Sequence, residues 1–308
     1  MSTLLSRLPR LQDIVPYRPL ADGGVTPVEA VADGLWVKRD DLTDSRYGGN
    51  KVRKLEHLLA IAERRGGVVL TAGATGSHHV VATAVHAGRL GLAVEAVRFP
   101  QPETPHVRAM AARAQLLGVR FSEASSSTAM PFVLARRWAA LRGSGATLVT
   151  PGGSTPVGVL GYVGAGLELV DQLDEPDEIV VALGSGGSAV GLALGVALGG
   201  WRRCVVRAIR VADTIITNMP VLRGIELGVR ELLLLGGARP PATRLLIDGA
   251  WFGDGYGHAT AEAAAASVRA AGLGLASEPT YTAKALAAAF ASLDAGKSVL
   301  YIQTYAGS

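Results

Sequence analysis

Runs of β-branched residues alternate along this chain with stretches of helical periodicity, and this alternation restricts the fold more than any other feature. Helices are predicted after Lys51, after Ser77, and over residues 104–117, 130–142, 158–173, 189–198, 259–271 and 281–294. Strands are predicted between them, at residues 68–71, 94–99, 147–150, 179–183, 205–211, 245–247 and 299–302. Such alternation is typical of a mostly parallel sheet covered by helices. The chain is therefore predicted to be an α/β protein.

Composition agrees with a large buried core. The 308 residues are 49% hydrophobic and only 18% charged, and 39 are glycine, which suits buried strands and loops that approach a ligand closely. No polar or proline-rich break is long enough to be an interdomain tether, so a second domain would be inserted in the first. The single cysteine, Cys204, excludes a disulfide framework and favours a reducing compartment.

The charge pattern and the N-terminus exclude several classes of partner. The net charge is +4, but the basic residues are scattered, with no run longer than two, so we expect no nucleic-acid partner. The first residues contain neither a long apolar stretch nor a cleavage pattern, and a cytoplasmic location is expected.

One segment imitates a membrane span. Residues 179–201 carry no charge, and glycines recur at every fourth position from Gly187 to Gly199. The glycine and serine run of 184–188 would interrupt a spanning helix, however. A strand, a glycine loop and a helix whose small-residue face packs on the sheet explain the segment better, and no membrane association is expected.

Lys51 stands in the first turn of a predicted helix, directly behind the pair Gly48 and Gly49. Asn50 is the predicted N-cap, and a glycine pair at residues 66–67 ends the helix. The positive end of the helix dipole disfavours an ammonium, so the amine pKa of Lys51 is predicted to be lowered, as imine chemistry requires. The alternative is a solvated basic turn.

Two further helix starts have the character of anion sites. The loop of residues 71–79 opens a helix whose free N–H groups could bind a carboxylate. The run 184–188 follows a strand and opens another, with small side chains that let backbone amides and two hydroxyls surround a phosphate. One lysine, one carboxylate site and one phosphate site together indicate pyridoxal phosphate chemistry on an amino acid.

These residues also carry a family resemblance. The run 38–56, with Gly-Gly-Asn-Lys at its centre, resembles the cofactor-lysine segment of the D-cysteine desulfhydrase and 1-aminocyclopropane-1-carboxylate (ACC) deaminase family. Further matches follow in order along the chain: 76–79 to a Ser-Asn-His loop, 152–162 to a Gly-Gly-Ser segment, 184–188 to a phosphate loop, 253–257 to Gly-Pro-Gly-Tyr-Gly, and 278–286 to Asp-Pro-Val-Tyr-Thr-Gly-Lys-Ala. The resemblance spans roughly residues 8–305.

The resemblance implies the fold-type II (tryptophan synthase β-like) architecture of pyridoxal phosphate enzymes, with two open twisted sheets covered by helices. A large cofactor-binding domain would comprise residues 1–54 and 159–308, and a small inserted domain residues 55–158. A homodimer is expected on the same ground.

The resemblance also implies roles for individual residues. Lys51 would be the Schiff-base lysine, Asn50 would bond the cofactor's phenolic oxygen, and Thr304 would contact the pyridine nitrogen. Ser77 would meet the substrate and act in proton transfer, while His78 and His79 would join it at the substrate carboxylate. Tyr256 and Tyr281 would line the substrate face, one of them moving a proton or activating the leaving group. The phosphate would be held by the five loop residues Gly184, Ser185, Gly186, Gly187 and Ser188.

The implied activity is α,β-elimination on a small amino acid, giving a 2-oxo acid and ammonia, as in D-cysteine desulfhydrase. Ring opening of ACC and β-replacement are alternatives on the same scaffold. This chain departs from the family at three positions. His78 stands where the family's Ser-Asn-His loop has asparagine, and Thr282 stands where ACC deaminases carry glutamate. His258 stands where an aliphatic residue is usual. Substrate and enantiomer stay open.

Other classes compete with this interpretation. Residues 184–189 also fit G-x-G-x-x-G/A, with Asp213 after the next strand, as in a nicotinamide-dependent oxidoreductase. A pyridoxal fold that has lost catalysis and acts as a binding protein is a third class. No metal site is expected, because the histidines at 78, 79 and 86 lack neighbouring carboxylates. His57 and His106 are predicted to lie at the surface.

Overall fold

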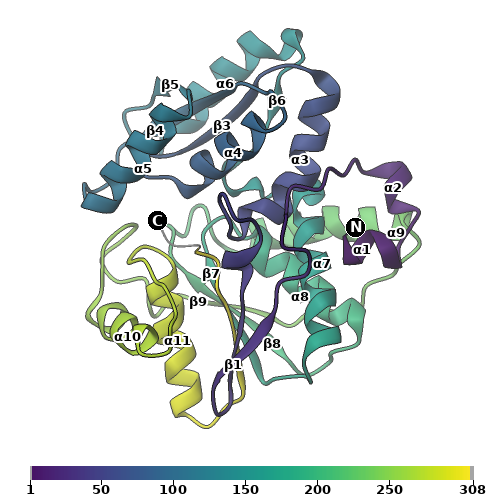
Figure 1. Cartoon of the computed structure of the whole chain (residues 1–308), viewed down its shortest axis with the longest axis vertical. Coiled ribbons are helices and arrows are strands. Elements are labelled where there is room, and N and C mark those ends of the chain that lie inside the picture. The colour runs from purple at the N-terminus through teal and green to yellow at the C-terminus, as the bar shows by residue number, and fades with distance from the viewer. Residues whose placement is uncertain (1, 306–308) are drawn as a thin grey trace.

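Two sheets organise the chain. The computed structural model describes residues 2–305, which form a six-stranded and a four-stranded sheet, each covered by helices on both faces. Figure 1 shows the four-stranded sheet with its helices above the six-stranded one. This is the α/β architecture that the alternation predicts, and the two open sheets of the expected fold class are confirmed.

The six-stranded sheet has the order β1-β2-β10-β7-β8-β9. Only β1 and β2 pair antiparallel; the other neighbours are parallel. The central strand β10 is paired on both sides, since Val299 faces Leu35 on one side and Glu178 on the other. The strands are β1 (Val28–Ala32), β2 (Leu35–Lys38), β7 (Glu178–Leu183), β8 (Val205–Arg210), β9 (Leu245–Asp248) and β10 (Val299–Ile302).

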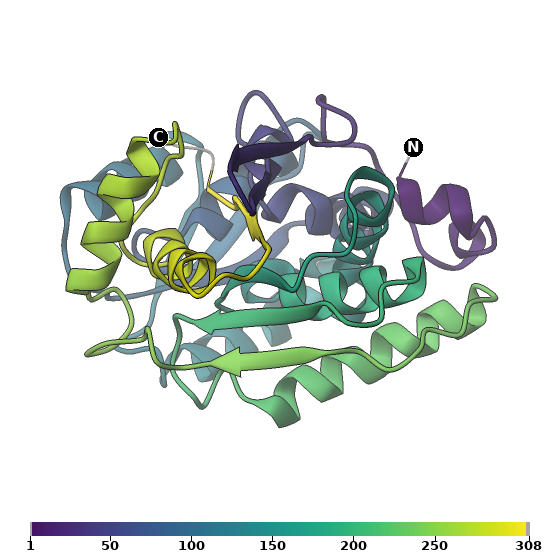
Figure 2. The same cartoon turned by 90° about the horizontal axis from the view of Figure 1, so that it is seen from below.

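Side chains of this sheet alternate between two hydrophobic cores, as the pleat of a strand requires. On β7, Ile179 and Val181 face one core, while Val180 faces the other. Helices α10 (Ala261–Ala271) and α11 (Thr282–Asp294) cover the face of Val180. Figure 2 shows them at the left and α9 at the lower right. The opposite face is covered by α1 (Thr3–Arg7), α2 (Leu11–Ile14), α7 (Pro156–Gln172), α8 (Gly187–Gly199) and α9 (Met219–Leu235).

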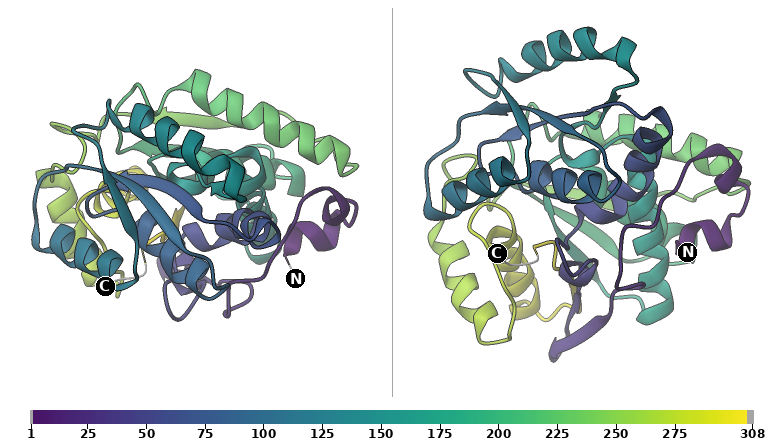
Figure 3. Two further views of the ribbon diagram at one scale, coloured as in Figure 1. Left: turned by 90° about the horizontal axis from the view of Figure 1, so that it is seen from above. Right: turned by 45° about the horizontal axis from the view of Figure 1, so that its top comes forward.

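The four-stranded sheet is wholly parallel, in the order β5-β4-β3-β6. Its strands are β3 (Val69–Ala74), β4 (Val94–Phe99), β5 (Arg120–Glu123) and β6 (Thr147–Leu148). One face packs against α3 (Lys51–Arg65), α4 (His78–Gly88) and α5 (Pro105–Leu116), and the other against α6 (Met130–Leu141). In the right view of Figure 3, α6 lies above this sheet and α5 below it. Short 3-10 turns lie at Asp40–Leu42, Arg142–Ser144 and Pro151–Gly153.

The periodic glycines of residues 187–199 have a packing reason. A Cβ at Gly191 would lie 2.4 Å from Cβ of Tyr162, and one at Gly195 would lie 2.3 Å from the Val163 carbonyl oxygen. Both contacts are with α7, so the small-residue face packs against this neighbouring helix and not, as predicted, on the sheet. Within the described residues no helix has the length and apolarity needed to cross a membrane.

Several elements escape the sequence prediction. The hairpin of β1 and β2, the polar strand β5, and helices α1, α2 and α9 were not predicted. The strands of the small sheet occupy residues 69–148, inside the expected insertion of 55–158. The domain boundaries at 54/55 and 158/159 stay a prediction.

Candidate active site

A pocket of about 400 Å³ is lined by residues of both sheets and their loops. It gathers residues from the start of α3, the end of β3, the loop after β7 and the segment after β10. Twelve of the thirteen predicted site residues line it: Asn50, Lys51, Ser77, His78, His79, Gly184, Ser185, Gly186, Ser188, Tyr256, Tyr281 and Thr304. Gly187 is not among the lining residues.

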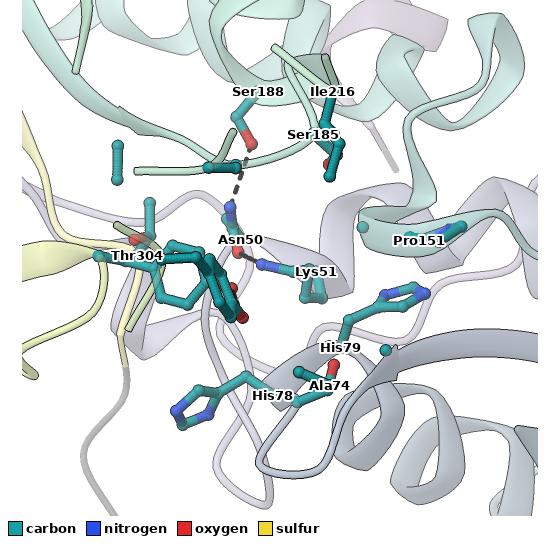
Figure 4. A pocket seen from close by; sticks show the side chains of 18 of the residues that line it. Asn50, Lys51, Ala74, His78, His79, Pro151, Ser185, Ser188, Ile216 and Thr304 are labelled. Carbon is teal, nitrogen blue, oxygen red and sulfur yellow. Dashed lines mark hydrogen bonds between the residues drawn. The ribbon is translucent and has the colours of Figure 1, made fainter. Parts of the chain in front are cut away.

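Lys51 is the first residue of α3 and extends its amine into this pocket. Its Nζ donates to Asn50 Oδ1 at 2.6 Å, and Asn50 Nδ2 donates to Ser188 Oγ at 3.1 Å, as the dashed lines in Figure 4 show. Burial lowers the pKa of Lys51 to about 8, although Glu278 acts in the opposite direction. The lowered pKa of Lys51 agrees with the prediction, and burial of the amine is its main cause.

Asn50 stands at the N-cap position of α3, as predicted, but its side chain makes no capping hydrogen bond. Its backbone is helical, at φ −62° and ψ −11°, and its amide is occupied by Lys51 and Ser188. The preceding Gly49 has φ +98°, and a Cβ there would lie 2.6 Å from the Thr304 carbonyl oxygen. Glycine is therefore needed to bring the start of α3 against the segment that follows β10. The other end behaves as predicted, since Gly66 closes the helix in the left-handed conformation.

Ser77 stands at the N-cap of α4, and its Oγ accepts the N–H of Val80 at 3.4 Å. The close approach to β3 depends on Gly73, where a Cβ would lie 2.4 Å from Ser77 Oγ. The first-turn N–H groups of a helix lack partners within the helix and attract anions. The start of α4 is therefore a suitable site for a carboxylate.

His79 is buried behind Ser77 and held in one tautomer. Thr71 Oγ1 donates to the Val149 carbonyl at 2.7 Å, so the same oxygen accepts from His79 Nε2 at 2.9 Å. Burial, reinforced by Lys51, lowers the pKa of His79 to about 3. His79 is therefore a neutral imidazole with its proton on Nε2.

His78 uses both ring nitrogens within the protein. Nδ1 lies 2.6 Å from the Tyr47 hydroxyl, and Nε2 lies 2.8 Å from Nε2 of His106. The Tyr305 ring packs edge-on against His78, and Figure 4 shows the His78 ring on the side away from His79. Burial lowers the pKa of His78 to about 3, with His106 acting in the same direction. A substrate could bond His78 only by replacing one of these partners.

The two histidines predicted to lie at the surface behave differently. His57 is fully buried, with Nδ1 3.0 Å from the Pro16 carbonyl oxygen and the ring packed against Tyr17. Its burial lowers the pKa to about 4. The surface prediction is therefore wrong for His57, because its helix face meets the N-terminal segment. His106 is half-buried beside His78.

The loop after β7, predicted to hold a phosphate, lines the pocket at the start of α8. Gly186 is the N-cap of α8 with φ +90°, which leaves the first-turn amides of α8 at the pocket. Ser185 Oγ lies 2.7 Å from Ser154 Oγ, which also accepts the Gly187 N–H at 3.0 Å. Ser154 thus occupies the amide of Gly187, which explains why Gly187 does not line the pocket.

Lys54 is a pocket residue that the motif analysis did not single out. It is fully buried, its Nζ donates to the Gly152 carbonyl at 3.1 Å, and a Cβ on Gly152 would meet Ser185 Oγ at 2.0 Å. Burial, together with Lys51, lowers the pKa of Lys54 well below its usual value. The sequence did hold a signal, since residues three apart in a helix share a face.

The hydroxyl groups of Tyr256 and Tyr281, both pocket residues, form a hydrogen-bonded pair. Their oxygens lie 2.6 Å apart and their rings meet edge-on. Burial raises the pKa of both phenols, so both keep their protons. Glu278 accepts the backbone N–H groups of Tyr281 and Thr282 and so fixes the start of α11, which places the Tyr281 ring.

The site therefore combines a weakly basic amine, two helix starts suited to anions, a second buried lysine and two phenolic protons. In the described part of the chain, no cluster of three or more histidine, cysteine, aspartate or glutamate side chains is arranged for a metal ion. The arrangement can hold an aldehyde at the amine, a phosphate at α8 and a carboxylate at α4. Protons can be moved by Lys51 and the tyrosine pair.

Comparisons with known proteins agree with this chemistry. Residues 20–304 match the family model described as "Pyridoxal-phosphate dependent enzyme". A Pyrococcus furiosus relative, 32% identical over 329 aligned positions covering 99% of this chain and 94% of the relative, carries 1-aminocyclopropane-1-carboxylate deaminase in its name. A Klebsiella pneumoniae protein named D-cysteine desulfhydrase is 33% identical over 306 positions, covering 92% of this chain and 88% of the relative.

A solved structure extends the similarity to three dimensions. The structure described as "Crystal Structure Analysis of the ACC deaminase homologue" superposes with a TM-score of 0.83 at 27% identity. The match covers 99% of this chain and 95% of that one. The architecture of this chain is therefore shared from end to end with a protein of the same family.

Proposed function

The chain belongs to the pyridoxal-phosphate dependent enzymes of fold-type II, and we propose that it catalyses α,β-elimination on a small amino acid, releasing a 2-oxo acid and ammonia. One observation carries the proposal: the amine of Lys51 faces a single pocket together with the Ser77 helix start and the phenolic pair. The desulfhydrase and deaminase relatives support the same reaction class. The nicotinamide and non-catalytic alternatives are not adopted, because they leave Lys51 and Ser77 without a role.

The residues present fit pyridoxal phosphate. Lys51 would hold its aldehyde, since the amine is uncharged in a substantial fraction near neutral pH. The phosphate would lie at the start of α8, against the backbone of Gly184, Ser185, Gly186 and Ser188 and the hydroxyl of Ser185, with the Lys54 amine behind Gly152 as a further hydrogen-bond donor. Thr304 would meet the ring nitrogen.

When bound, the cofactor acidifies the substrate Cα–H by delocalising the negative charge that proton removal leaves. Lys51 is the base that we assign to the Cα proton. A pKa of about 8 leaves enough neutral amine for this role. A threonine hydroxyl at Thr304 carries no fixed negative charge, which favours elimination over transamination.

The substrate carboxylate would bind at the start of α4. The Ser77 hydroxyl and the first-turn amides supply donors there, and His79 shapes the wall behind them. His78 would act indirectly, because Tyr47 and His106 occupy its two nitrogens. We therefore assign carboxylate binding to Ser77 first and treat His78 as part of the pocket wall.

The tyrosine pair would protonate the leaving group. Each phenol keeps its proton because burial raises its pKa, and one hydroxyl donates to the other across 2.6 Å. A proton given up by one tyrosine can be replaced through the other. Departure of a thiol or hydroxyl from Cβ needs such a proton.

Ring opening of ACC is the weaker alternative. In the family, ACC deaminases carry a glutamate where this chain has Thr282. The Thr282 hydroxyl is buried and accepts the N–H of Glu278 at 2.8 Å, so it serves the start of α11 and supplies no carboxylate.

The proposed function is tested with the purified holoenzyme and a panel of D- and L-amino acids that differ only in the group on Cβ. We expect equal amounts of ammonia and 2-oxo acid from amino acids with a β-thiol, β-chloro or β-acyloxy group, and none from alanine. Turnover of ACC, or exchange of the α-proton without ammonia release, would contradict elimination as the main reaction.

Assembly and location complete the proposal. We propose a cytoplasmic homodimer without a nucleic-acid partner, an expectation supported by the family resemblance and the scattered basic residues. Light scattering after size-exclusion chromatography tests the dimer, and cell fractionation tests the location. A monomeric mass at micromolar concentration would refute the first part.

A further inference from the structure

Gln101 lies in the pocket wall and is not used by the proposed chemistry. It stands between Pro100 and Pro102 in the segment that follows β4, and both prolines also line the pocket. A proline ring fixes its own φ angle, and Pro102 also restricts the backbone of the residue before it. The position of Gln101 is therefore set by a stiff stretch of backbone.

Hydrogen bonds tie this segment to the loop before α4. The carbonyl of Phe99 accepts the N–H of Thr75 at 3.0 Å and the Thr75 hydroxyl at 3.2 Å. One residue further along each segment, the N–H of Gly76 donates to Gln101 Oε1 at 3.3 Å. The amide of Gln101 therefore lies directly beside the residue that precedes Ser77.

The Gly76 N–H also fixes the orientation of the Gln101 amide. The oxygen and nitrogen of an amide are interchangeable in shape, but a backbone N–H can donate only to the oxygen. Oε1 is thus occupied, and Nε2 is the atom left to meet a ligand. No acceptor for Nε2 is found among residues 2–305, so this half-buried amide has its N–H donors free at the pocket wall.

The pocket has few cations to offer a substrate carboxylate. In the described part of the chain, Lys51 and Lys54 are the only lysine or arginine residues that line it, and the proposed function assigns both to the cofactor. The amide of Asn50 is also occupied, since its Nδ2 donates to Ser188. Neutral donors must therefore hold the carboxylate, and the free donors of Gln101 lie next to the loop that supplies the others.

We propose that Gln101 binds the substrate, with Nε2 donating to one oxygen of the substrate carboxylate while the Ser77 hydroxyl and the start of α4 hold the other. The inference rests on the proposed function, because it concerns the substrate of the same site. A carboxylate accepts about four hydrogen bonds, so donors from two segments can share it. The site therefore selects amino acids with a free carboxylate.

The test measures binding of D- and L-alanine to the holoenzyme, because alanine has the carboxylate but no leaving group. Binding is followed by the change in absorbance of the bound cofactor. Gln101→Glu keeps an oxygen for the Gly76 N–H but replaces the N–H donors by a negative charge, and Gln101→Met removes the donors without adding charge. Gln115→Glu is the matched control, since Gln115 is exposed on α5 and does not line the pocket.

The Kd for alanine should rise about tenfold or more in Gln101→Met, the loss expected for a hydrogen bond to a charged group, and further in Gln101→Glu. Gln115→Glu should bind alanine like the wild type. The Kd for ethylamine, which is alanine without its carboxylate, should be the same in the wild type and in every variant. During elimination KM should rise with little change in kcat, because Gln101 is assigned to binding and to no proton transfer.

An unchanged alanine Kd in a Gln101 variant would overturn the inference, and either variant decides the point if the other does not fold. Equal weakening of alanine and ethylamine would also overturn it, because the role of Gln101 would then be structural. A wild type that binds neither enantiomer of alanine would refute the carboxylate site itself. The proposed function fails separately, if the wild type binds alanine but releases no 2-oxo acid from any β-substituted amino acid.

Discussion

The hydroxyl pair of Tyr256 and Tyr281 gives a sharp test of how the leaving group obtains its proton. Tyr281→Phe removes one of two half-buried hydroxyls that lie 2.6 Å apart. Loss of a positioned proton donor typically lowers kcat by about 10²- to 10⁴-fold, or about 3 to 5 kcal/mol of transition-state stabilisation. KM should change little, because neither hydroxyl is assigned to the substrate carboxylate.

A double-mutant cycle decides whether the two hydroxyls act as a unit. If one phenol donates through the other, Tyr256→Phe should also slow turnover, and the double variant should be about as slow as the slower single variant. The coupling energy would then be at least about 1.4 kcal/mol, a factor of ten in kcat.

The assay is steady-state release of 2-oxo acid from an amino acid with a poor leaving group, where protonation limits the rate. A good leaving group, such as chloride, should be much less sensitive to both substitutions. The reasoning is refuted if the two losses multiply, or if both leaving groups suffer equally.

The remaining predictions concern the phosphate site, helix packing and acid stability. Lys54→Met should weaken binding of pyridoxal phosphate about tenfold or more in equilibrium titrations. Binding of pyridoxal, which lacks the phosphate, should be nearly unchanged. Equal weakening of both ligands would show that Lys54 does not act at the phosphate. Gly195→Ala should destabilise the protein by about 1 to 3 kcal/mol in urea unfolding, since the new Cβ would lie 2.3 Å from a carbonyl oxygen of α7. Gly224→Ala is the control, because a Cβ at this position on α9 meets open space, and it should stabilise the protein by up to about 1 kcal/mol. The free energy of unfolding should fall as the pH drops below about 6.5. Below that pH the histidines of the unfolded chain bind protons, whereas the buried imidazoles of the folded chain stay neutral, so each costs about 1.4 kcal/mol of stability per pH unit in this window. A urea midpoint independent of pH between 6.5 and 5 would contradict the prediction. The histidines concerned are His57, His78 and His79.

Much of the fold could be predicted because its central strands are buried on both faces. The strands at residues 94–99 and 299–302 begin and end where the β-branched runs do. Prediction failed where the pattern is weak. The strand β5 is polar and half-exposed, and α9 holds a proline in its first turn and two glycines, so neither stands out in the sequence.

Those site residues could be predicted whose role follows from their immediate sequence neighbours. Lys51, Ser77 and the loop of 184–188 each stand at a helix start, and such positions can be found along the chain. Contacts between distant segments carry no such signal. The bonds that join Tyr47 to His78 and Tyr162 to Asp40 connect residues 31 and 122 positions apart, and only the folded chain shows them.

The central claim is that Lys51 is the lysine that binds the cofactor, and borohydride reduction of the purified holoenzyme tests it most directly. After reduction and digestion, mass spectrometry should find the mass of the reduced cofactor on the peptide that contains Lys51, and Lys51→Ala should take up none and release no 2-oxo acid. The cofactor found on Lys54, or turnover retained by Lys51→Ala, would contradict the account.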